Sequence, residues 1–218
     1  MKTELVKSLK ITILTDNSNS WILPYVEKLK FKLYHHKITH IFNHKDINSG
    51  DIMLILSCEK IISSDHLNFH KHNIVVHPSR LPHGKGWSPL AWQVFEGKNT
   101  IPVSLFEATE ELDSGDVYLV EDLHLDGCEL NNKIKHKQGI ITIKMIQNFI
   151  DNYESIVGIP QTGKGSVYRK RITKDSELDI NKSIKEQINL LRIVDHKRYP
   201  AHFYVGNKKY VLKIYEED

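Results

Sequence analysis

Two short segments of the sequence combine a residue that can transfer protons with a loop that can expose it. The first, His77 to Trp92 (HPSRLPHGKGWSPLAW), places a histidine after an apolar stretch and before a loop rich in glycine and proline. The second, Glu110 to Asp116 (EELDSGD), is acidic and contains Asp113. A histidine beside a carboxylate is oriented and made more basic, which suits general acid–base catalysis. The two motifs are equally compatible with a simple turn and a loop between strands.

The apolar pattern predicts which elements position these segments. Strands are expected over 11–14, 39–42, 51–56, 73–76, 102–107 and 117–123, and helices over 21–29, 87–96 and 130–156. Strands that alternate with helices, and the near-continuous apolar run at 51–56, are typical of an α/β fold with a mostly parallel sheet. Ligands bind beyond the carboxyl ends of such strands. We therefore expect His77 and Asp113 to meet there, from neighbouring strand ends.

The character of the sequence changes near residue 158. A loop at 160–165 is followed by Asp179 and Asn181, and then by a predicted helix with Ile184, Ile188 and Leu191 on one face. Segments 201–205 and 209–214 alternate around Gly206-Asn207, which predicts a β-hairpin. These features divide the chain into a catalytic domain, 1–157, and a small C-terminal region, 158–218, with a helix and a hairpin.

Length and composition bound the class of protein. The chain has 218 residues, of which 40% are hydrophobic and 26% charged, with a mean hydropathy of −0.38. These values exclude a membrane protein, a collagen-like repeat and a disordered tail. The net charge is +3, carried by 25 lysines and five arginines against 27 acidic residues. Because arginine reads phosphates and bases better than lysine, this balance disfavours nucleic-acid binding.

Cysteines, histidines and the N-terminus indicate the compartment and the cofactors. Cys58 and Cys128 lie far apart without metal-type spacing, and neither a signal peptide nor a membrane span can be built from the N-terminus, so we expect a cytoplasmic protein. The 13 histidines are scattered, and no metal is expected. The pairs His35/His36 and His66/His70 lie in polar surroundings and are expected to face solvent.

The stretch IVVHPSRLPHGKGWSPLAWQVFEGKNTIPVSLFEATEELDSGD resembles the core of the folate-dependent formyltransferases. That family includes glycinamide ribonucleotide, methionyl-tRNA and nucleotide-sugar N-formyltransferases. Its pattern is Asn-x-His-x-Ser-x-Leu-Pro, a glycine-containing loop and helix, and then Leu-Asp-x-Gly. The similarity is close over about residues 73 to 121 and looser over most of the chain. It implies a Rossmann-like formyltransferase fold and transfer of a formyl group from N10-formyltetrahydrofolate to an amine, with no metal.

The resemblance places the catalytic His of the family on His77 and its catalytic Asp on Asp113. The catalytic Asn of the family falls on Val75, which is a departure from the pattern. Asn73 lies on the same face of the strand but about 6.6 Å further back, so we do not expect it to substitute. A lost amide donor implies another donor, a slower enzyme or an inactive one.

The motifs HPSxLPxGKGWSP and WQxxEGKNxIPVxLFEA resemble in particular the bacterial sugar N-formyltransferases, of the kind that act on UDP-4-amino sugars in pseudaminic-acid-type pathways. Residues 198–203 resemble their short tail, whereas the 60 residues after 158 are too few for the basic C-terminal domain of the tRNA enzymes. The glycinamide enzymes end near the long helix, so the tail also argues against them. The resemblance implies a nucleotide-sugar substrate, no nucleic acid or membrane partner, and a monomer or homodimer.

The resemblance also implies supporting residues. Donor-binding residues would be Ser57, Cys58, Pro82, Glu110 and Leu112, and substrate-binding residues Ser79, Lys85, Trp87, Tyr199 and Phe203. Four of them have a structural alternative: Lys85 as a solvated loop lysine, Trp87 as a packed helix cap, and Tyr199 and Phe203 as core aromatics of the C-terminal region. Two other functions stay open, namely a folate or nucleotide-sugar binding protein that has lost turnover and a small RNA-binding module.

Overall fold

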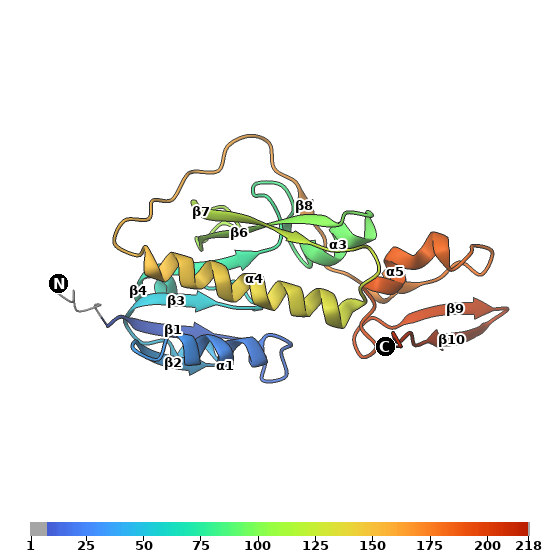
Figure 1. The fold of residues 1–218 in the computed structure, drawn as a ribbon, viewed down its shortest axis with the longest axis horizontal. Coiled ribbons are helices and arrows are strands. Elements are labelled where there is room, and N and C mark those ends of the chain that lie inside the picture. Colours follow the sequence, from blue (N-terminus) through green and yellow to red (C-terminus); the bar gives the residue numbers. More distant parts are fainter. Residues whose placement is uncertain (1–7, 218) are drawn as a thin grey trace.

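The computed structural model describes residues 8–217 and is organised around a six-stranded sheet with strand order β2-β1-β3-β4-β6-β7 (Figure 1). The strands are β1 (Lys10–Leu14), β2 (Lys37–Ile41), β3 (Gly50–Ile55), β4 (His70–His77), β6 (Thr100–Glu107) and β7 (Val117–His124). The first four are parallel to one another, whereas β6 is antiparallel to both β4 and β7. The predicted α/β fold with a mostly parallel sheet is confirmed.

Both faces of the sheet are covered, which explains the near-continuous apolar run of β3. Because successive side chains of a strand point to opposite faces, Leu54 packs with α1 (Leu23–Lys32) and α4 (Asn131–Asp151) in the main core cluster. Met53 and Ile55 belong to a second cluster on the other face, near η1 (His44–Asp46) and α2 (Ser64–Leu67). No helix within residues 8–217 is long and apolar enough to cross a membrane.

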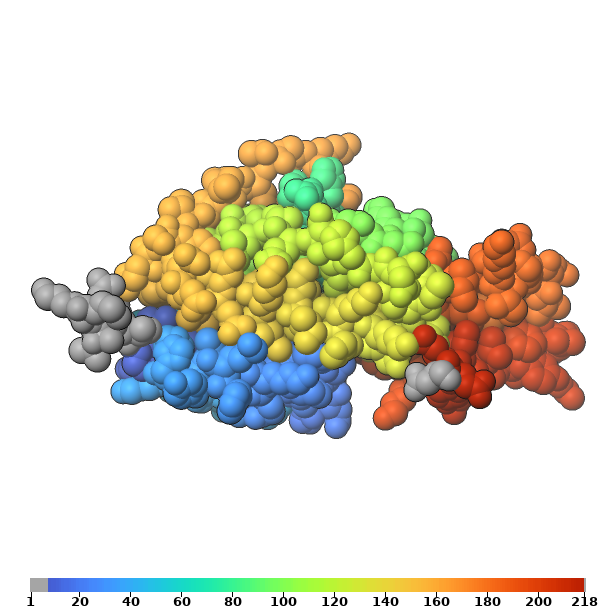
Figure 2. Space-filling model, viewed as in Figure 1, coloured from blue at the N-terminus to red at the C-terminus, as the bar shows by residue number. Residues whose placement is uncertain are grey.

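The C-terminal region begins with a long loop that runs back over the molecule after α4, and its later elements lie at the end of the sheet to which the parallel strands point (Figure 1). Its elements are β8 (Val167–Tyr168), η2 (Thr173–Ser176), η3 (Lys185–Gln187), α5 (Ile188–Arg192), β9 (Ala201–Val205) and β10 (Lys208–Leu212). β9 and β10 form the predicted hairpin. A small core of its own, which includes Leu178, Leu191 and Ala201, stabilises the region. Figure 2 shows the later, red part of this region at one end of an elongated molecule.

A buried ion pair joins the C-terminal region to the rest of the molecule. Arg192 is 1% exposed and donates to the side chain of Asn99 and to both the carbonyl and the carboxylate of Glu129. Burial raises the pKa of Glu129, but hydrogen bonds from Lys137 and from the Asp126 amide outweigh it, so that its pKa is lowered overall. The carboxylate therefore stays charged between its partners, as a buried charge must.

Two expectations for local structure are wrong. The helix predicted around Ile184 is reduced to η3 and the short α5, and Ile184 is exposed. The cause is local, because the side chain of Gln187 donates to the backbone carbonyls of Asp179, Lys182 and Ser183 and holds a turn where the helix would start.

The expectation that both histidine pairs face solvent is wrong for one member of each pair. His36 and His70 are buried, and one ring nitrogen of each has a partner far away in the sequence: the amide of Leu9 donates to His36 Nδ1, and His70 Nε2 bonds Thr12 Oγ1 of β1. Burial lowers the pKa of both imidazoles.

Candidate active site

The loop after β4 holds the imidazole of His77 in place. His77 is the last residue of β4 and is 7% exposed, and its Nε2 lies 2.8 Å from the carbonyl oxygen of Gly84. A carbonyl only accepts, so Nε2 carries the proton of this bond. Gly84 has φ +73° and packs on Ser79, where a Cβ would come within 2.9 Å of the serine Cβ. The glycine therefore lets the loop turn back onto the imidazole.

Asp113 is carried to His77 by a loop that turns back, and not by the end of a strand beside β4 as the sequence predicts. Because β6 is antiparallel to β4, its last residue, Glu107, pairs with Ile74 in the middle of β4. The amide of Ala108 then donates to the carbonyl of Asn73, and residues 108–116 fold back along the sheet. The aspartate thus arrives from a returning loop, and the expectation of neighbouring strand ends is wrong.

The two side chains nevertheless meet. Asp113 Oδ2 lies 3.8 Å from His77 Nε2, and the amide of Gly86 donates to the same oxygen over 2.8 Å. The first distance is too long for a hydrogen bond but suits an ion pair with a protonated imidazole. A partly buried carboxylate that is fixed by a backbone amide beside an imidazole is an arrangement suited to acid–base chemistry.

Position 75 offers no donor to this site. Val75 lies one pleat before His77 on the same face of β4 and packs with Cys58 and Ala108 against the second core cluster. The side-chain amide of Asn73 donates to the carbonyl of Leu67 over 3.0 Å and is held away from His77. The structure thus agrees with the expectation that Asn73 does not replace the missing Asn.

Lys85, Trp87 and Pro82 lie in the loop that covers the site. Lys85 Nζ donates to Ser114 Oγ over 2.6 Å and so connects this loop to the one that carries Asp113. β5 (Lys85–Gly86) pairs with β8, and the Trp87 amide donates to the carbonyl of Tyr168. The carbonyl of Pro82 accepts from the amide of Ser166. The loop that carries these three residues thus contacts both the Asp113 loop and residues 166–168.

The residues predicted to bind the folate lie partly at the surface. Ser57 follows β3, is exposed, and accepts a hydrogen bond from Ser20. Cys58 is partly buried against the second cluster, and burial, together with nearby Asp16, raises the pKa of its thiol to about 12. Glu110 is exposed and Leu112 half-buried in the loop of Asp113. Their contact with a donor stays a prediction.

Three predicted acceptor-binding residues are buried or packed against other side chains of the protein. Ser79 is 2% exposed and lies beneath the loop, so direct contact with a substrate would require the loop to move. The guanidinium groups of Arg171 and Arg198 lie 5.0 and 5.7 Å from the Tyr199 ring centroid. Phe203 stacks on Tyr210 within the hairpin, with ring centroids 5.4 Å apart. These contacts correspond to the structural alternative for the aromatic residues.

Sequence reasoning missed Gln161. It lies in the loop after α4, and its Nε2 donates to the carbonyls of Asp113 and Gly115 over 2.9 and 2.8 Å. A polar residue after a proline in a loop gave no signal of this role.

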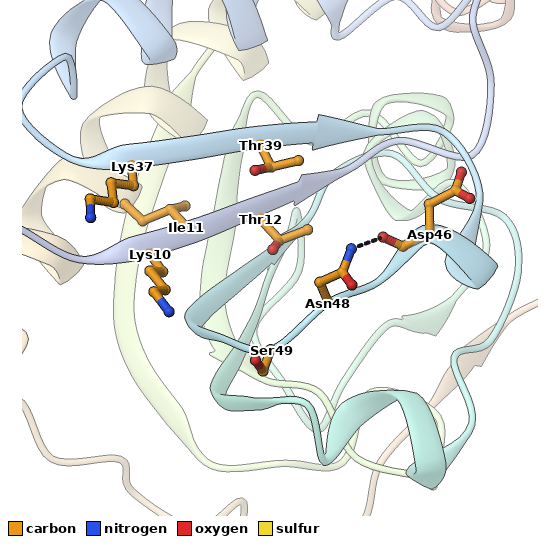
Figure 3. Close-up of a pocket in the computed structure, with 8 residues that line it drawn as sticks. All are labelled: Lys10, Ile11, Thr12, Lys37, Thr39, Asp46, Asn48 and Ser49. Atoms are coloured by element: carbon orange, nitrogen blue, oxygen red, sulfur yellow. Dashed lines mark hydrogen bonds between the residues drawn. The ribbon is translucent and has the colours of Figure 1, made fainter.

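Two cavities lie away from the His77–Asp113 pair. One, of about 250 Å³, is lined by residues of β1 and β2 and by Asp46, Asn48 and Ser49 (Figure 3). The other, of about 660 Å³, lies between α1 and α4 and includes the exposed Phe31. Among residues 8–217, no group of three His, Cys, Asp or Glu side chains could hold a metal ion.

Comparison with known proteins assigns the chain to a family. The model of the formyl transferase family matches residues 24–146, more than half of the chain, and this segment contains both His77 and Asp113. The chain therefore belongs to the formyl transferase family, and its fold is the Rossmann-like formyltransferase fold.

Curated relatives that match the chain are methionyl-tRNA formyltransferases. The methionyl-tRNA formyltransferase of Lachnospira eligens is 26% identical over 175 residues, which cover 78% of this chain and 54% of that protein. The chain spans about half the length of the curated relatives it matches.

Two solved structures share the fold. A sugar N-formyltransferase from a Shewanella species aligns with TM-score 0.70 and 15% identity over 96% of this chain and 98% of its own. HypX from Aquifex aeolicus in complex with tetrahydrofolic acid aligns with TM-score 0.75 and 17% identity over 93% of this chain and 37% of its own.

Proposed function

We propose that the protein is an N-formyltransferase that moves a formyl group from N10-formyltetrahydrofolate to the amine of a nucleotide-linked amino sugar. The observation that carries the proposal is the His77–Asp113 pair, 3.8 Å apart, within a segment that matches the formyl transferase family. The donor is supported by family membership and by the shared fold of a structure that holds tetrahydrofolic acid.

The reaction needs one proton transfer and one stabilised oxyanion. The neutral amine attacks the formyl carbon, a tetrahedral intermediate forms, the bond to N10 breaks, and the proton of the amine ends on N10. Because Nε2 of His77 is committed to the Gly84 carbonyl, Nδ1 is the nitrogen that exchanges a proton with the reactants. When the imidazole is charged, Nδ1 donates toward the oxyanion, and Asp113 stabilises the charge.

The valine at position 75 leaves this reaction with fewer donors than the family pattern has. One preorganised oxyanion donor is typically worth about 3–4 kcal/mol. His77 must therefore supply most of the stabilisation in this chain, with help from a backbone amide or a fixed water. An active enzyme needs this stabilisation from His77. The alternative, a protein that binds folate or a nucleotide sugar without turnover, does not.

The acceptor is the finer part of the proposal. A nucleotide sugar is supported by the loop motif of residues 77–92, by Lys85 between two glycines, and by a sugar N-formyltransferase whose whole chain aligns with this one. A tRNA acceptor is the second candidate, because the curated relatives are methionyl-tRNA formyltransferases. Salt-dependent binding to RNA would favour that second candidate.

The test is turnover with a panel of acceptors. Purified protein is given N10-formyltetrahydrofolate and UDP- or dTDP-linked 4-amino sugars, or methionyl-tRNA, and formylated product is detected by mass spectrometry. We expect product with at least one amino sugar and none in His77→Ala. The matched control is His83→Ala, at an exposed histidine of the same loop, which should retain activity. Tight folate binding without product for any acceptor would instead establish the binding protein.

A further inference from the structure

One side chain holds the backbone of the loop that carries Asp113. The Nε2 group of Gln161 donates to the carbonyl of Asp113 over 2.9 Å and to that of Gly115 over 2.8 Å. Because both partners are carbonyls, which only accept, the amide nitrogen of Gln161 must be the atom that faces them. A single group thus uses both of its protons to fix two points of the same loop.

The loop needs such support because its backbone adopts unusual conformations. Asp113 has φ +48°, in the left-handed region that non-glycine residues rarely occupy. At Gly115 a Cβ would collide with the carbonyl of Glu107, so the loop also packs closely on the end of β6. Such conformations persist where the surrounding structure over-determines them.

Gln161 lies next to a short antiparallel backbone pairing between the start of β7 and the loop after α4. Val117 and Ile159 exchange two backbone hydrogen bonds of 2.9 Å as an antiparallel pair at the start of β7. Gly115 lies two residues before Val117 and Gln161 two residues after Ile159, and the left-handed turn at Asp113 then carries the loop away from a regular ladder. The side chain of Gln161 bridges this gap and does there what a backbone amide would do in a longer strand.

The same segment also fixes the other half of the pair. Ser166 Oγ accepts from the amide of Gly84 over 2.9 Å, and the carbonyl of Ser166 accepts from the amide of Lys85 over 2.9 Å. Gly84 is the residue whose carbonyl receives the His77 Nε2 proton. Residues 159–168 therefore contact both loops on which the geometry of the His77–Asp113 pair depends.

The amide oxygen of Gln161 bears on why a glutamine stands at this position. Oε1 is buried and has no hydrogen-bond partner among the groups of residues 8–217. A buried acceptor without a partner is unfavourable, and an apolar side chain of the same length would avoid it. The glutamine is thus explained by the two protons that its nitrogen supplies.

We propose that Gln161 is a positioning residue for formyl transfer, which acts by holding Asp113 beside His77. This inference rests on the proposed function for its catalytic consequence, but the structural step can be measured without any substrate. The reporter is the amide of Gly86, which donates to Asp113 Oδ2 and should lose protection from exchange when Asp113 moves.

The experiment compares Gln161→Met with the matched control Gln147→Met. Gln147 is a half-buried glutamine on α4, away from both loops. Hydrogen exchange of the Gly86 amide is followed by NMR. We expect on the order of tenfold faster exchange in Gln161→Met and no change in Gln147→Met, with the amides of β3 unaffected in both. Gln161→Glu, which keeps the size but removes the donors, should behave like Gln161→Met.

Kinetics then separates this inference from the proposed function. With an active acceptor, kcat of Gln161→Met should fall by roughly 10- to 100-fold while the KM values for folate and acceptor stay close to wild type, because misplacement of a catalytic group affects the chemical step. Unchanged exchange at Gly86 in both Gln161 variants would overturn the inference, whatever the activity. Faster exchange with unchanged kcat would also overturn it. Absence of turnover in the wild type would refute the proposed function alone.

Discussion

Val75→Asn tests whether the site lacks a donor or has been rebuilt around the valine. The substitution places a carboxamide on the same face of β4 as His77, about 6.6 Å earlier along the strand. Its surroundings are apolar, since Val75 packs with Cys58 and Ala108 on the second core cluster. Two effects with opposite consequences are therefore expected, one on the reaction rate and one on stability.

The sizes of the expected changes in rate and in stability follow from these contacts. An added oxyanion donor should raise the single-turnover rate by up to about 10²-fold. A buried amide that is unpaired in the free enzyme should lower the free energy of unfolding by about 1–3 kcal/mol. For a chain of this length, that corresponds to a Tm lower by roughly 2–12 °C. The variant should thus be faster and less stable than the wild type.

The assay is single-turnover formylation at saturating donor and acceptor, with Tm measured by differential scanning fluorimetry. Val120→Asn is the matched control, because Val120 is a 40%-exposed strand residue on β7 and should change neither quantity. Combining Val75→Asn with His77→Ala adds a second readout, since an introduced donor should restore part of the activity that His77→Ala removes. A rate equal to or below that of wild type, with the expected loss of Tm, would refute the idea of a missing donor.

Three further predictions follow from individual residues. Asp113→Asn should lower kcat by about 10²–10⁴-fold, because it removes the charge beside His77, whereas Asp116→Asn at an exposed site nearby should not; equal losses would contradict a specific role for Asp113. Glu129 has a lowered pKa in the folded protein, so its stabilising contribution is present above its unfolded pKa of about 4.3 and should be lost as pH falls below that value; urea unfolding of Glu129→Gln should lack this pH dependence. Because the Cys58 thiol has a pKa of about 12, a thiol reagent at pH 8 should modify the exposed Cys128 first, as peptide mapping would show.

The sequence was sufficient for features that depend on local patterns. The apolar run of β3 predicted a strand covered on both faces, and the structure confirms it. The hairpin around Gly206 was predicted by turn chemistry in the same way. His77 and Asp113 were singled out by residue type and assigned their roles by the resemblance to the formyltransferases, and the structure places Nε2 and Oδ2 of the pair 3.8 Å apart.

Features that depend on distant partners could not be predicted. The direction of β6 is set by its pairing with β4 and β7, and nothing within 100–107 reveals it, so the route of the Asp113 loop was missed. His70 reads as a polar surface residue, but its partner Thr12 lies on another strand. The helix around Ile184 was wrongly predicted for a different, local reason, since the competing hydrogen bonds come from the Gln187 side chain, which the apolar pattern does not reveal.

The geometry of the site depends on a segment that carries neither of its catalytic candidates. His77 is fixed by the end of a buried strand, but its Nε2 partner is a loop carbonyl, and Asp113 belongs to a second loop with a left-handed backbone. Among the hydrophobic clusters of residues 8–217, none is formed by either loop. Residues 159–168 bind both, through Gln161 on one side and Ser166 on the other. Because these contacts are made by a region that follows α4, the relative placement of His77 and Asp113 depends on the packing of residues 159–168 as well as on the sheet.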